Sequence, residues 1–407
     1  MNGKRVNLGI LGFGKRGRIY AAYAKKHPDE FAVVAAADTA PERRAAAARE
    51  FGCPVFEDYG QLLASRPKAD IIVVSTQDSD HPEHAIACMK NGYDILLEKP
   101  IASTEQGCLE IAAAAKKYNR KVVVCHVLRY TPFYETIKDL IDSGELGEIV
   151  LVSATENVGY YHQAHSFVRG PWRNSLKSCP MILAKCCHDM DILRWIVGEK
   201  CEKAVSFGSL RYFKKENAPQ GAATRCSECP LTSCIYKAQA IYAKYHWMAE
   251  YFSDASDIET VMNDLKNSHY DRCVFACDND VVDHQTSVFT FSGGVVASHT
   301  MTAFSREIYR TIKIHGTKAE LVGVMEKNFI ELRCLGGGVE QVSLDENRTL
   351  GNHGGGDDGL MRELYLVCNG YPSKKVTYLD VSLDSHFMAF AAERSRLSGK
   401  VESVKKI

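Results

Sequence analysis

Short apolar runs alternate with helix-like stretches along the first 130 residues. Polar or turn-forming residues bound each run, and the stretches between them are rich in alanine and charged residues. Such fully apolar runs are typical of strands that are buried on both faces of a parallel sheet. The predicted strands are Val6–Leu11, Ala32–Ala37, Ile71–Ser75, Asp94–Leu97 and Lys121–Val127. The alternation predicts an α/β domain over residues 1–130, with a doubly wound parallel sheet.

The pattern changes after Gly147. Several later segments are short and separated by tight turns such as Ser292-Gly293-Gly294, which indicates antiparallel strands. The predicted strands are Glu148–Glu156, Val288–Phe291, Val295–Thr300, Arg310–His315, Ala319–Met325 and Phe329–Cys334, and the predicted helices are Pro180–Val197 and Asp384–Leu397. Residues 131–407 should form an α+β domain with an open, mostly antiparallel sheet. Its last helix, at about 384–398, can pack back near the first domain.

The composition narrows the function. The 407 residues include 50 Lys+Arg and 50 Asp+Glu, so the net charge of zero argues against nucleic acid as the main partner. No apolar run approaches the roughly 18 residues that span a bilayer, and the first apolar run enters a glycine loop, unlike a signal peptide. We therefore expect a cytoplasmic protein with no membrane partner, whose 15 cysteines are mostly reduced.

A glycine-rich loop follows the first predicted strand and opens a helix. Gly12 permits a tight turn, Gly14 lets the backbone approach a pyrophosphate, and Gly17 lets the helix pack closely on the strand. The helix N-terminus offers free N–H groups to the phosphates. Phe13, Lys15 and Arg16 complete the loop. The context predicts a dinucleotide site.

Asp38 stands 21 residues after Gly17, at the end of the second predicted strand. A carboxylate there binds the ribose hydroxyls and repels a 2′-phosphate, which favours NAD over NADP. The alternative for Asp38 is a simple turn acid. Lys15 and Arg16 could bind a 2′-phosphate, but we expect them to contact the pyrophosphate or the solvent.

Two further motifs resemble the Gfo/Idh/MocA oxidoreductases. They are the segment Ser75–Ala85, which contains Thr76 and His81, and the later Glu98-Lys99-Pro100. The resemblance extends over essentially the whole chain. It implies a Rossmann domain that binds NAD over residues 1–130, with Thr76, His81, Glu98 and Lys99 beside the cofactor. It also implies that Lys99 lies at the active site.

The second domain carries the same resemblance. Gly144–Ile149, the helix with His188 and Asp191, and the stretch that starts at His353 look like the corresponding parts of these enzymes. The resemblance implies that residues 131–407 bind a small carbohydrate or a derivative of one, beside the nicotinamide. It also implies homodimers or homotetramers that are built through the sheet of this domain.

Lys99, His188 and Lys185 are the candidate catalytic residues. Removing a hydride from a carbon beside a hydroxyl needs a base for the hydroxyl proton, and a lysine must lose its own proton to serve. Lys99 could instead act as a fixed cation. His188 has the more suitable intrinsic pKa. Lys185, His188 and Asp191 are spaced three apart, so on one continuous helix they would share a face, where Asp191 could orient the His188 ring.

Ala184 departs from the family pattern. Sugar dehydrogenases of this type often have an aspartate at this position, four residues before the histidine. Lys185 beside it could bind an anionic substrate or lower the pKa of Lys99; an outward, solvated lysine is the alternative.

An aromatic tract follows the first strand of the second domain. It is dense in hydrogen-bonding side chains, as expected of a surface for a polyhydroxylated ligand; a plain surface loop is the alternative. The candidate substrate-binding residues are Tyr160, His162, His165, Arg169, Trp172, Arg173, Asp191 and His353. His126 and Arg129 end a strand of the first domain and can reach the same place.

Cys226, Cys229 and Cys234 have a spacing that suits a structural zinc or an iron–sulfur site. Cys273 or Cys277 could supply a fourth ligand. The alternative is a set of free thiols that pack a loop.

These features favour an NAD-dependent oxidoreductase that acts on a hydroxyl of a sugar or sugar derivative. A second hypothesis is a redox-neutral, NAD-dependent glycosidase that oxidises, eliminates, hydrates and reduces again. For that chemistry Tyr160, His162 or Lys185 could supply the extra base. A third hypothesis is a non-catalytic NAD-binding protein, which the intact Lys99 and His188 disfavour.

Overall fold

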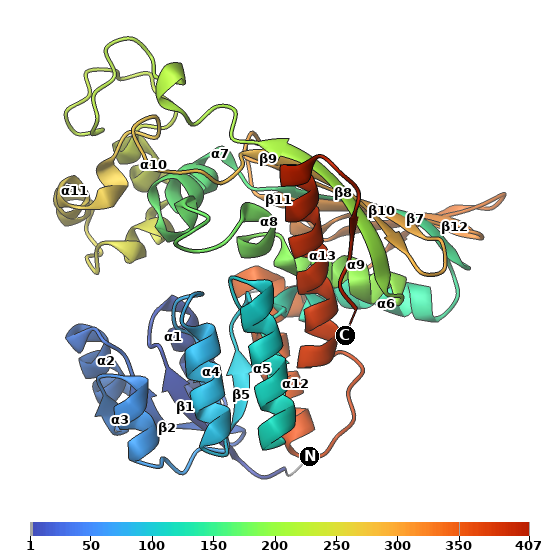
Figure 1. Ribbon diagram of the computed structural model, residues 1–407, viewed down its shortest axis with the longest axis horizontal. Helices are drawn as coiled ribbons and strands as arrows, with labels where there is room; N and C mark the ends of the chain where they lie inside the picture. The colour runs from blue at the N-terminus through green and yellow to red at the C-terminus, as the bar shows by residue number, and fades with distance from the viewer. Residues whose placement is uncertain (1–2, 350, 407) are drawn as a thin grey trace.

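The computed structural model describes residues 3–349 and 351–406. Figure 1 shows a lower layer of helices and short strands from the N-terminal part of the chain and, above it, a broad sheet from the later part. No helix in the described ranges is long and apolar enough to cross a membrane.

The N-terminal sheet has six parallel strands in the order β3-β2-β1-β4-β5-β6. This topology confirms the predicted doubly wound sheet. The strands are β1 (Val6–Leu11), β2 (Phe31–Ala37), β3 (Val55–Phe56), β4 (Ile71–Val74), β5 (Asp94–Leu97) and β6 (Val122–Val124). The helices between them are α1 (Lys15–Lys26), α2 (Pro41–Phe51), α3 (Tyr59–Ala64), α4 (His81–Lys90) and α5 (Glu105–Tyr118).

The second sheet has nine strands in the order β14-β13-β12-β11-β7-β10-β9-β8-β15. Every neighbouring pair is antiparallel except β10 and β7, which confirms a mostly antiparallel open sheet. The strands are β7 (Ile149–Asn157), β8 (Cys201–Ser209), β9 (His284–Phe291), β10 (Val296–Thr302), β11 (Tyr309–Gly316), β12 (Ala319–Val324), β13 (Phe329–Cys334), β14 (Val339–Val342) and β15 (Glu402–Ser403).

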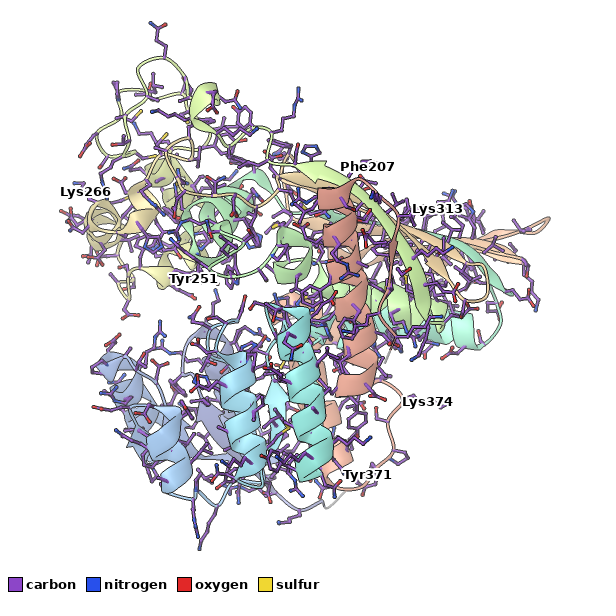
Figure 2. The ribbon with its side chains drawn as sticks, viewed as in Figure 1. Phe207, Tyr251, Lys266, Lys313, Tyr371 and Lys374 are labelled. Atoms are coloured by element: carbon purple, nitrogen blue, oxygen red, sulfur yellow. The ribbon has the colours of Figure 1, made fainter. Side chains whose placement is uncertain are left out.

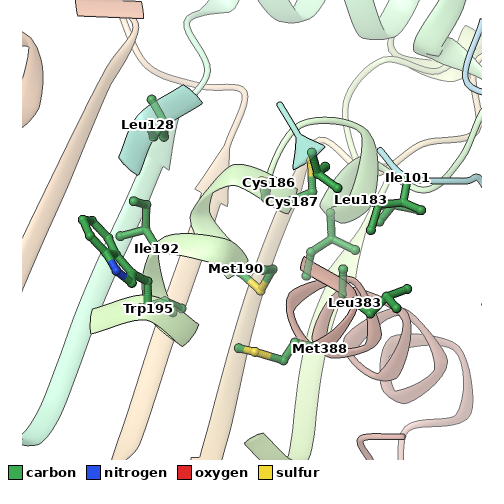
Figure 3. Close-up of a cluster of buried hydrophobic side chains, with 14 of the residues drawn as sticks. Ile101, Leu128, Leu183, Cys186, Cys187, Met190, Ile192, Trp195, Leu383 and Met388 are labelled. Atoms are coloured by element: carbon green, nitrogen blue, oxygen red, sulfur yellow. The ribbon is translucent and has the colours of Figure 1, made fainter. Parts of the chain in front are cut away.

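Helices cover one face of this sheet. They are α6 (Pro132–Asp142), α8 (Met181–Ala184), α9 (Cys187–Val197) and α13 (Leu379–Ser398), and α13 lies along β8 (Figure 1). Cys186, Cys187 and Met190 pack there with Leu383 and Met388 of α13 (Figure 3). The other helices of this half are α7 (Tyr160–His162), α10 (Ala238–Lys244), α11 (Ile258–Asn267) and α12 (Gly356–Cys368).

The end of the chain returns to the N-terminal sheet. Leu360, Met361 and Leu364 of α12 are buried in the same hydrophobic cluster as Leu8 and Ile10 of β1. The predicted closing helix starts earlier than expected, at Leu379, and it contacts α5 as well as β8. Residues 356–398 therefore hold the two sheets together.

The predicted helix Pro180–Val197 is in fact two helices. Helix α8 ends at Ala184, and α9 begins at Cys187. The Ala184 carbonyl accepts a hydrogen bond from Lys99 Nζ at 2.9 Å, so a side chain from the other sheet is bound at the break. Lys185 lies in the break and does not continue the helical face of His188 and Asp191.

Candidate active site

The glycine loop has the geometry of a dinucleotide turn. Gly12 has φ of +92°, and a Cβ there would lie 2.5 Å from the carbonyl oxygen of Ser75. At Gly17 a Cβ would lie 2.1 Å from the Gly12 carbonyl oxygen, so only glycine allows α1 to pack this closely. At Gly14 the nearest atom to a Cβ is Arg43 Nη1, at 3.5 Å. The open side of the loop is therefore at Gly14, where the N-terminus of α1 offers its N–H groups.

Asp38 is held in place at the end of β2. Its Oδ2 accepts a hydrogen bond from the Phe13 N–H at 2.8 Å, and its Oδ1 accepts one from the Ala40 N–H at 2.9 Å. Arg43 Nη1 lies 3.6 Å from the same carboxylate. A braced carboxylate next to the glycine loop fits the ribose of NAD.

Arg16 binds two carboxylates and keeps only its Nη1 without a partner among the described residues. Its Nε donates to Glu98 Oε1 at 2.5 Å, and its Nη2 donates to Asp357 Oδ1 at 2.6 Å. Tyr20 also donates to Glu98. The Arg16 guanidinium keeps the pKa of the buried Glu98 carboxyl below its usual value. Arg16 and Glu98 thus form an internal support for Lys99, whose backbone N–H donates to Glu98 Oε2.

Lys15 contacts residues 247–251, and this contact could not be predicted from the sequence. Its Nζ lies 3.2 Å from Glu250 and over the rings of Trp247 and Tyr251, at 5.2 and 5.3 Å from the ring centres. Figure 2 shows Tyr251 on the edge of the upper lobe that faces the N-terminal helices. We call the segment His246–Tyr251 the cover segment, because it lies against the start of α1.

Lys99 follows β5 and reaches the second half of the molecule through its bond to Ala184. The loop that carries it is braced by His81, whose Nδ1 lies 2.7 Å from the Pro100 carbonyl oxygen. Thr76 Oγ1 is hydrogen-bonded to His84. Thr76 and His81 thus shape the loops at the carboxyl ends of β4 and β5, where doubly wound sheets place their ligands.

His188 lies among other histidines. Its ring centre is 5.9 Å from that of His126 and 6.0 Å from that of His353. Burial lowers the pKa of His188 well below its usual value, and the charge of Lys99 lowers it further. Burial also lowers the pKa of His126 well below its usual value, and the charge of Arg129 lowers it further. Both imidazoles are therefore neutral at pH 7, and His188 is a weaker base than its ordinary pKa suggested.

Asp191 does not orient His188. Both of its oxygens accept hydrogen bonds from Arg129 at 2.6 Å, and the two side chains are buried. A two-point pair of this kind satisfies both charges and joins the end of β6 to α9. Asp191 and Arg129 therefore compensate each other's charge, and both oxygens of Asp191 are engaged by Arg129 rather than by the His188 ring.

Lys185 is paired with Glu156, which the sequence reasoning missed. Glu156 lies on β7, completely buried, at 3.2 Å from Lys185 and 2.7 Å from Arg310. Arg310 also holds Asp189 at 2.9 Å. The sequence feature that could have identified Glu156 is a carboxylate at an inward-facing position of a strand with alternating burial, two residues after Ala154. Because Glu156 neutralises Lys185, this lysine is not a free anion-binding cation.

The aromatic tract divides into two groups. Burial lowers the pKa of His162 well below its usual value, and the charges of Lys185 and Lys99 lower it further, so both lysines are near enough to act on its ring. Trp172 donates its Nε1–H to Asp78 Oδ2 at 3.0 Å, which links the tract to the loop after β4. Asp78 was not singled out from the sequence.

The remaining members of the tract support the fold. Arg169 is fully buried and donates to the carbonyl of Arg272, and Arg173 pairs with Asp278 at 2.6 Å, so both guanidinium groups bind within the fold. His165 stacks on Tyr270, and Tyr160 packs beside Tyr161 and Tyr236. His353 is hydrogen-bonded to Asp357 and remains next to His188.

Several buried polar atoms, on the three histidines that feel the charge of Lys99 and on Gln163 next to His162 in the sequence, lack a hydrogen-bond partner among the described residues. Buried polar groups are normally satisfied, so such atoms indicate where a polar ligand binds. They are both ring nitrogens of His126, His162 Nδ1, both amide atoms of Gln163, and His188 Nδ1.

The cysteines predicted to bind a metal line a separate cavity. Cys226, Cys229, Cys234 and Cys273 line one cavity of ≈ 20 Å³, whereas Cys277 does not. Within the described ranges, the one group of three metal-ligating atoms within 4.8 Å of one another is Cys186, Asp189 and His299. Arg310 already forms an ion pair with Asp189 in this group, so the charge of Asp189 is balanced by Arg310.

Two protein-family models match this chain, and their descriptions agree with the two domains of the observed fold. Residues 6–126 match a family model described as an oxidoreductase family with an NAD-binding Rossmann fold. Residues 138–340 match the model of its C-terminal alpha/beta domain. Together the two matches cover well over half of the chain.

The individual relatives share a third or less of their aligned residues with this chain. The Bacillus subtilis protein YteT is 26% identical over 388 residues, which cover 88% of each chain. Inositol 2-dehydrogenase 2 of Saccharopolyspora erythraea is 32% identical over 205 residues, which are 49% of this chain and 56% of that one. Levoglucosan dehydrogenase in complex with NADH and levoglucosan aligns with a TM-score of 0.72 at 19% identity, over 99% of this chain and 100% of the other.

Proposed function

Because the chain belongs to the Gfo/Idh/MocA oxidoreductase family, we propose that it moves a hydride between NAD and a hydroxyl-bearing carbon of a sugar or sugar derivative. The observation that carries the proposal is the position of Lys99. Its loop follows β5 at the ligand-binding edge of the parallel sheet, and its amine reaches Ala184 beside the buried His188.

The residues fit the cofactor. Gly12, Gly14 and Gly17 shape the loop for the pyrophosphate, and Asp38 is aligned for the ribose hydroxyls. The nicotinamide, when bound, supplies the hydride acceptor. NAD is favoured over NADP because the Asp38 carboxylate repels a 2′-phosphate.

The proton is handled by Lys99 and His188. Oxidation breaks the C–H and O–H bonds of the alcohol and forms C=O, so one hydride and one proton leave. His188 is neutral and can accept or share the proton with the neighbouring Lys99. The charge of Lys99 disfavours protonation of His188, because the two like charges would be close.

A polyhydroxylated substrate suits the surroundings. The unpartnered atoms of His126, His162 and Gln163 offer donors and acceptors to several hydroxyl groups. The names of the related inositol and levoglucosan dehydrogenases point to the same substrate class. Since Glu156 already pairs with Lys185, we favour a neutral polyol or sugar over an anionic one.

The test is turnover with NAD. The protein is mixed with NAD and a panel of free sugars, polyols and glycosides, and NADH absorbance and aglycone release are followed together. Accumulation of NADH with a free sugar or polyol supports the proposal. Aglycone release without net NADH would replace it with the redox-neutral glycosidase, and NAD binding without any turnover would leave a non-catalytic protein.

Lys99→Met should lower kcat by about 10²- to 10⁴-fold, the range for loss of general acid–base catalysis. NAD affinity, measured by calorimetry, should change little. Lys90→Met removes an exposed lysine at the end of α4 and is the matched control. Undiminished turnover of the Lys99 variant would contradict the mechanism.

We also propose a cytoplasmic homo-oligomer that forms through the uncovered face of the nine-stranded sheet. Leu151 and Phe207 alternate with the buried residues of β7 and β8 and so lie on that face, and Phe207 is 68% exposed. Apolar side chains on an open sheet favour association with a second copy. A monomer mass by light scattering would contradict this proposal. A structural zinc at the cysteine cluster takes no part in the reaction.

A further inference from the structure

Two segments that are distant in the sequence bring four cysteines to one cavity. Arg225 and Arg272 form an isolated antiparallel bridge. The Cys226 N–H donates to the Asp271 carbonyl at 2.7 Å, and the Cys273 N–H donates to the Thr224 carbonyl at 2.8 Å. Cys226 and Cys273 therefore lie diagonally on the same side of this short ladder. The loop from Cys226 then turns back, so that Cys229 and Cys234 line the same cavity.

A buried cation without a counter-ion points into this cluster. Arg169 is fully buried, and its Nη2 lies 3.5 Å from Cys226 Sγ. Its other bonds go to the carbonyls of Arg272 and Tyr236, and its Nη1 has no partner. Among the described residues no carboxylate forms an ion pair with Arg169, although a buried guanidinium requires a compensating negative charge. Neutral thiols cannot supply that charge, whereas thiolates can.

We propose that Cys226, Cys229, Cys234 and Cys273 bind one Zn²⁺ ion as four thiolates. Four thiolates and one zinc carry a net charge of −2, which Arg169 and the cavity-lining Lys237 offset. The Arg169 N–H to sulfur contact is the kind of supporting hydrogen bond that orients a metal ligand. The bridge between residues 225 and 272 fixes the spacing of two ligands before the ion arrives.

Binding must draw the sulfur atoms together. No three of these four sulfur atoms lie within 4.8 Å of one another in the described structure. Zinc–sulfur bonds of about 2.3 Å require a closer tetrahedron. The cavity of ≈ 20 Å³ has room for a single ion, and rotation of the cysteine side chains around it can close the set.

The zinc would have a structural role. The two segments that it joins flank α10, α11 and the cover segment, which lies against Lys15 of the glycine loop. One ion that cross-links the ends of these two segments restricts the motion of α10, the cover segment and α11 between them, as a short disulfide would. Four protein ligands leave no open position for a substrate, so the ion does not enter the reaction.

The experiment is metal analysis of the untagged protein, purified without chelators. We expect one zinc per chain by mass spectrometry, and four sulfur ligands by X-ray absorption at the zinc edge. Cys273→Ser should retain less than about a tenth of the zinc, because three thiolates hold the ion far more weakly. Cys277→Ser changes a neighbouring thiol that does not line the cavity and should keep the full content.

Three results would overturn the proposal. The wild-type protein could contain no zinc and react with a thiol reagent at all four cysteines while folded. It could carry iron instead, or disulfides among these residues by peptide mass. If Cys273→Ser does not fold, the X-ray absorption of the wild-type protein decides, since zinc bound by fewer than four sulfurs contradicts the assignment.

Discussion

Asp38 should decide between NAD and NADP. Its carboxylate repels a 2′-phosphate, but Arg43 Nη1 lies only 3.6 Å away and could bind one. In Asp38→Ser the repulsion is lost and Arg43 is released. A charged hydrogen bond contributes about 2 kcal/mol, so the preference for NADP should rise roughly thirtyfold. The measurement is the ratio of kcat/KM for the two cofactors.

The double variant Asp38→Ser with Arg43→Ala is the control for this prediction. It should lose the gain toward NADP, because the phosphate then has no cation to contact. An Asp38→Ser enzyme with an unchanged cofactor ratio would show that the ribose does not lie against Asp38.

Local motifs could be read from the sequence, whereas long-range partners could not. The glycine loop, Asp38 and Lys99 are each recognisable from their near neighbours. Arg16 pairs with Glu98 and Asp357, 82 and 341 residues away, so these ion pairs leave no local trace in the sequence. Arg129 likewise takes Asp191, 62 residues away, from the role expected beside His188.

At the scale of elements, most strand positions agree with the alternation of apolar residues. Strands β1 and β5 have the predicted bounds. The break between α8 and α9 was missed because the bond at Ala184 comes from Lys99, 85 residues earlier. Helix α12 was missed because it begins in the glycine-rich stretch Gly354–Gly356, which disfavours helix by propensity. Its burial against β1 provides the stabilisation that propensity lacks.

Glu156 joins three elements, and its loss should destabilise the fold. It binds Lys185 between α8 and α9 and Arg310 on β11, from a completely buried position on β7. Glu156→Gln leaves two cations partly uncompensated, which costs about 3 kcal/mol. Chemical denaturation should show a lower midpoint. Glu307→Gln, an exposed acid, is the control and should unfold like the wild type. Equal midpoints for the two variants would contradict the buried network.

The cover segment should slow the exchange of the cofactor. Trp247 and Tyr251 pack over Lys15 at the start of α1, where the pyrophosphate is expected. Trp247→Ala removes one cation–π contact of about 0.5–1 kcal/mol, so NADH should dissociate about two- to fivefold faster. Stopped-flow fluorescence measures this rate. Ile258→Ala changes another exposed apolar residue of the same lobe and should not alter it. Unchanged release in Trp247→Ala would mean that the segment does not cover NADH.

For the whole molecule, buried neutral histidines set the response to acid. Burial lowers the pKa of His126, His162 and His188 well below the usual value. It lowers the pKa of His165 and His386 to about 3. In the unfolded chain each of these groups binds a proton near pH 6.5. The unfolded state therefore binds more protons than the folded state between about pH 6.5 and pH 3.

Folding stability should accordingly fall as the pH drops below about 6.5, and it should be nearly constant just above that value. Each histidine contributes up to about 1.4 kcal/mol per pH unit, so several acting together give a steep loss. The free energy of unfolding, measured with denaturant from pH 8 to pH 5, tests this directly. Because His386 is fixed by Ile101 and Ser382, His386→Gln should lower the stability at pH 8 but also reduce the slope below pH 6.5. A wild-type curve that is flat down to pH 5 would mean that these imidazoles bind protons as readily in the folded protein as in the unfolded chain, which would contradict the lowering of their pKa by burial.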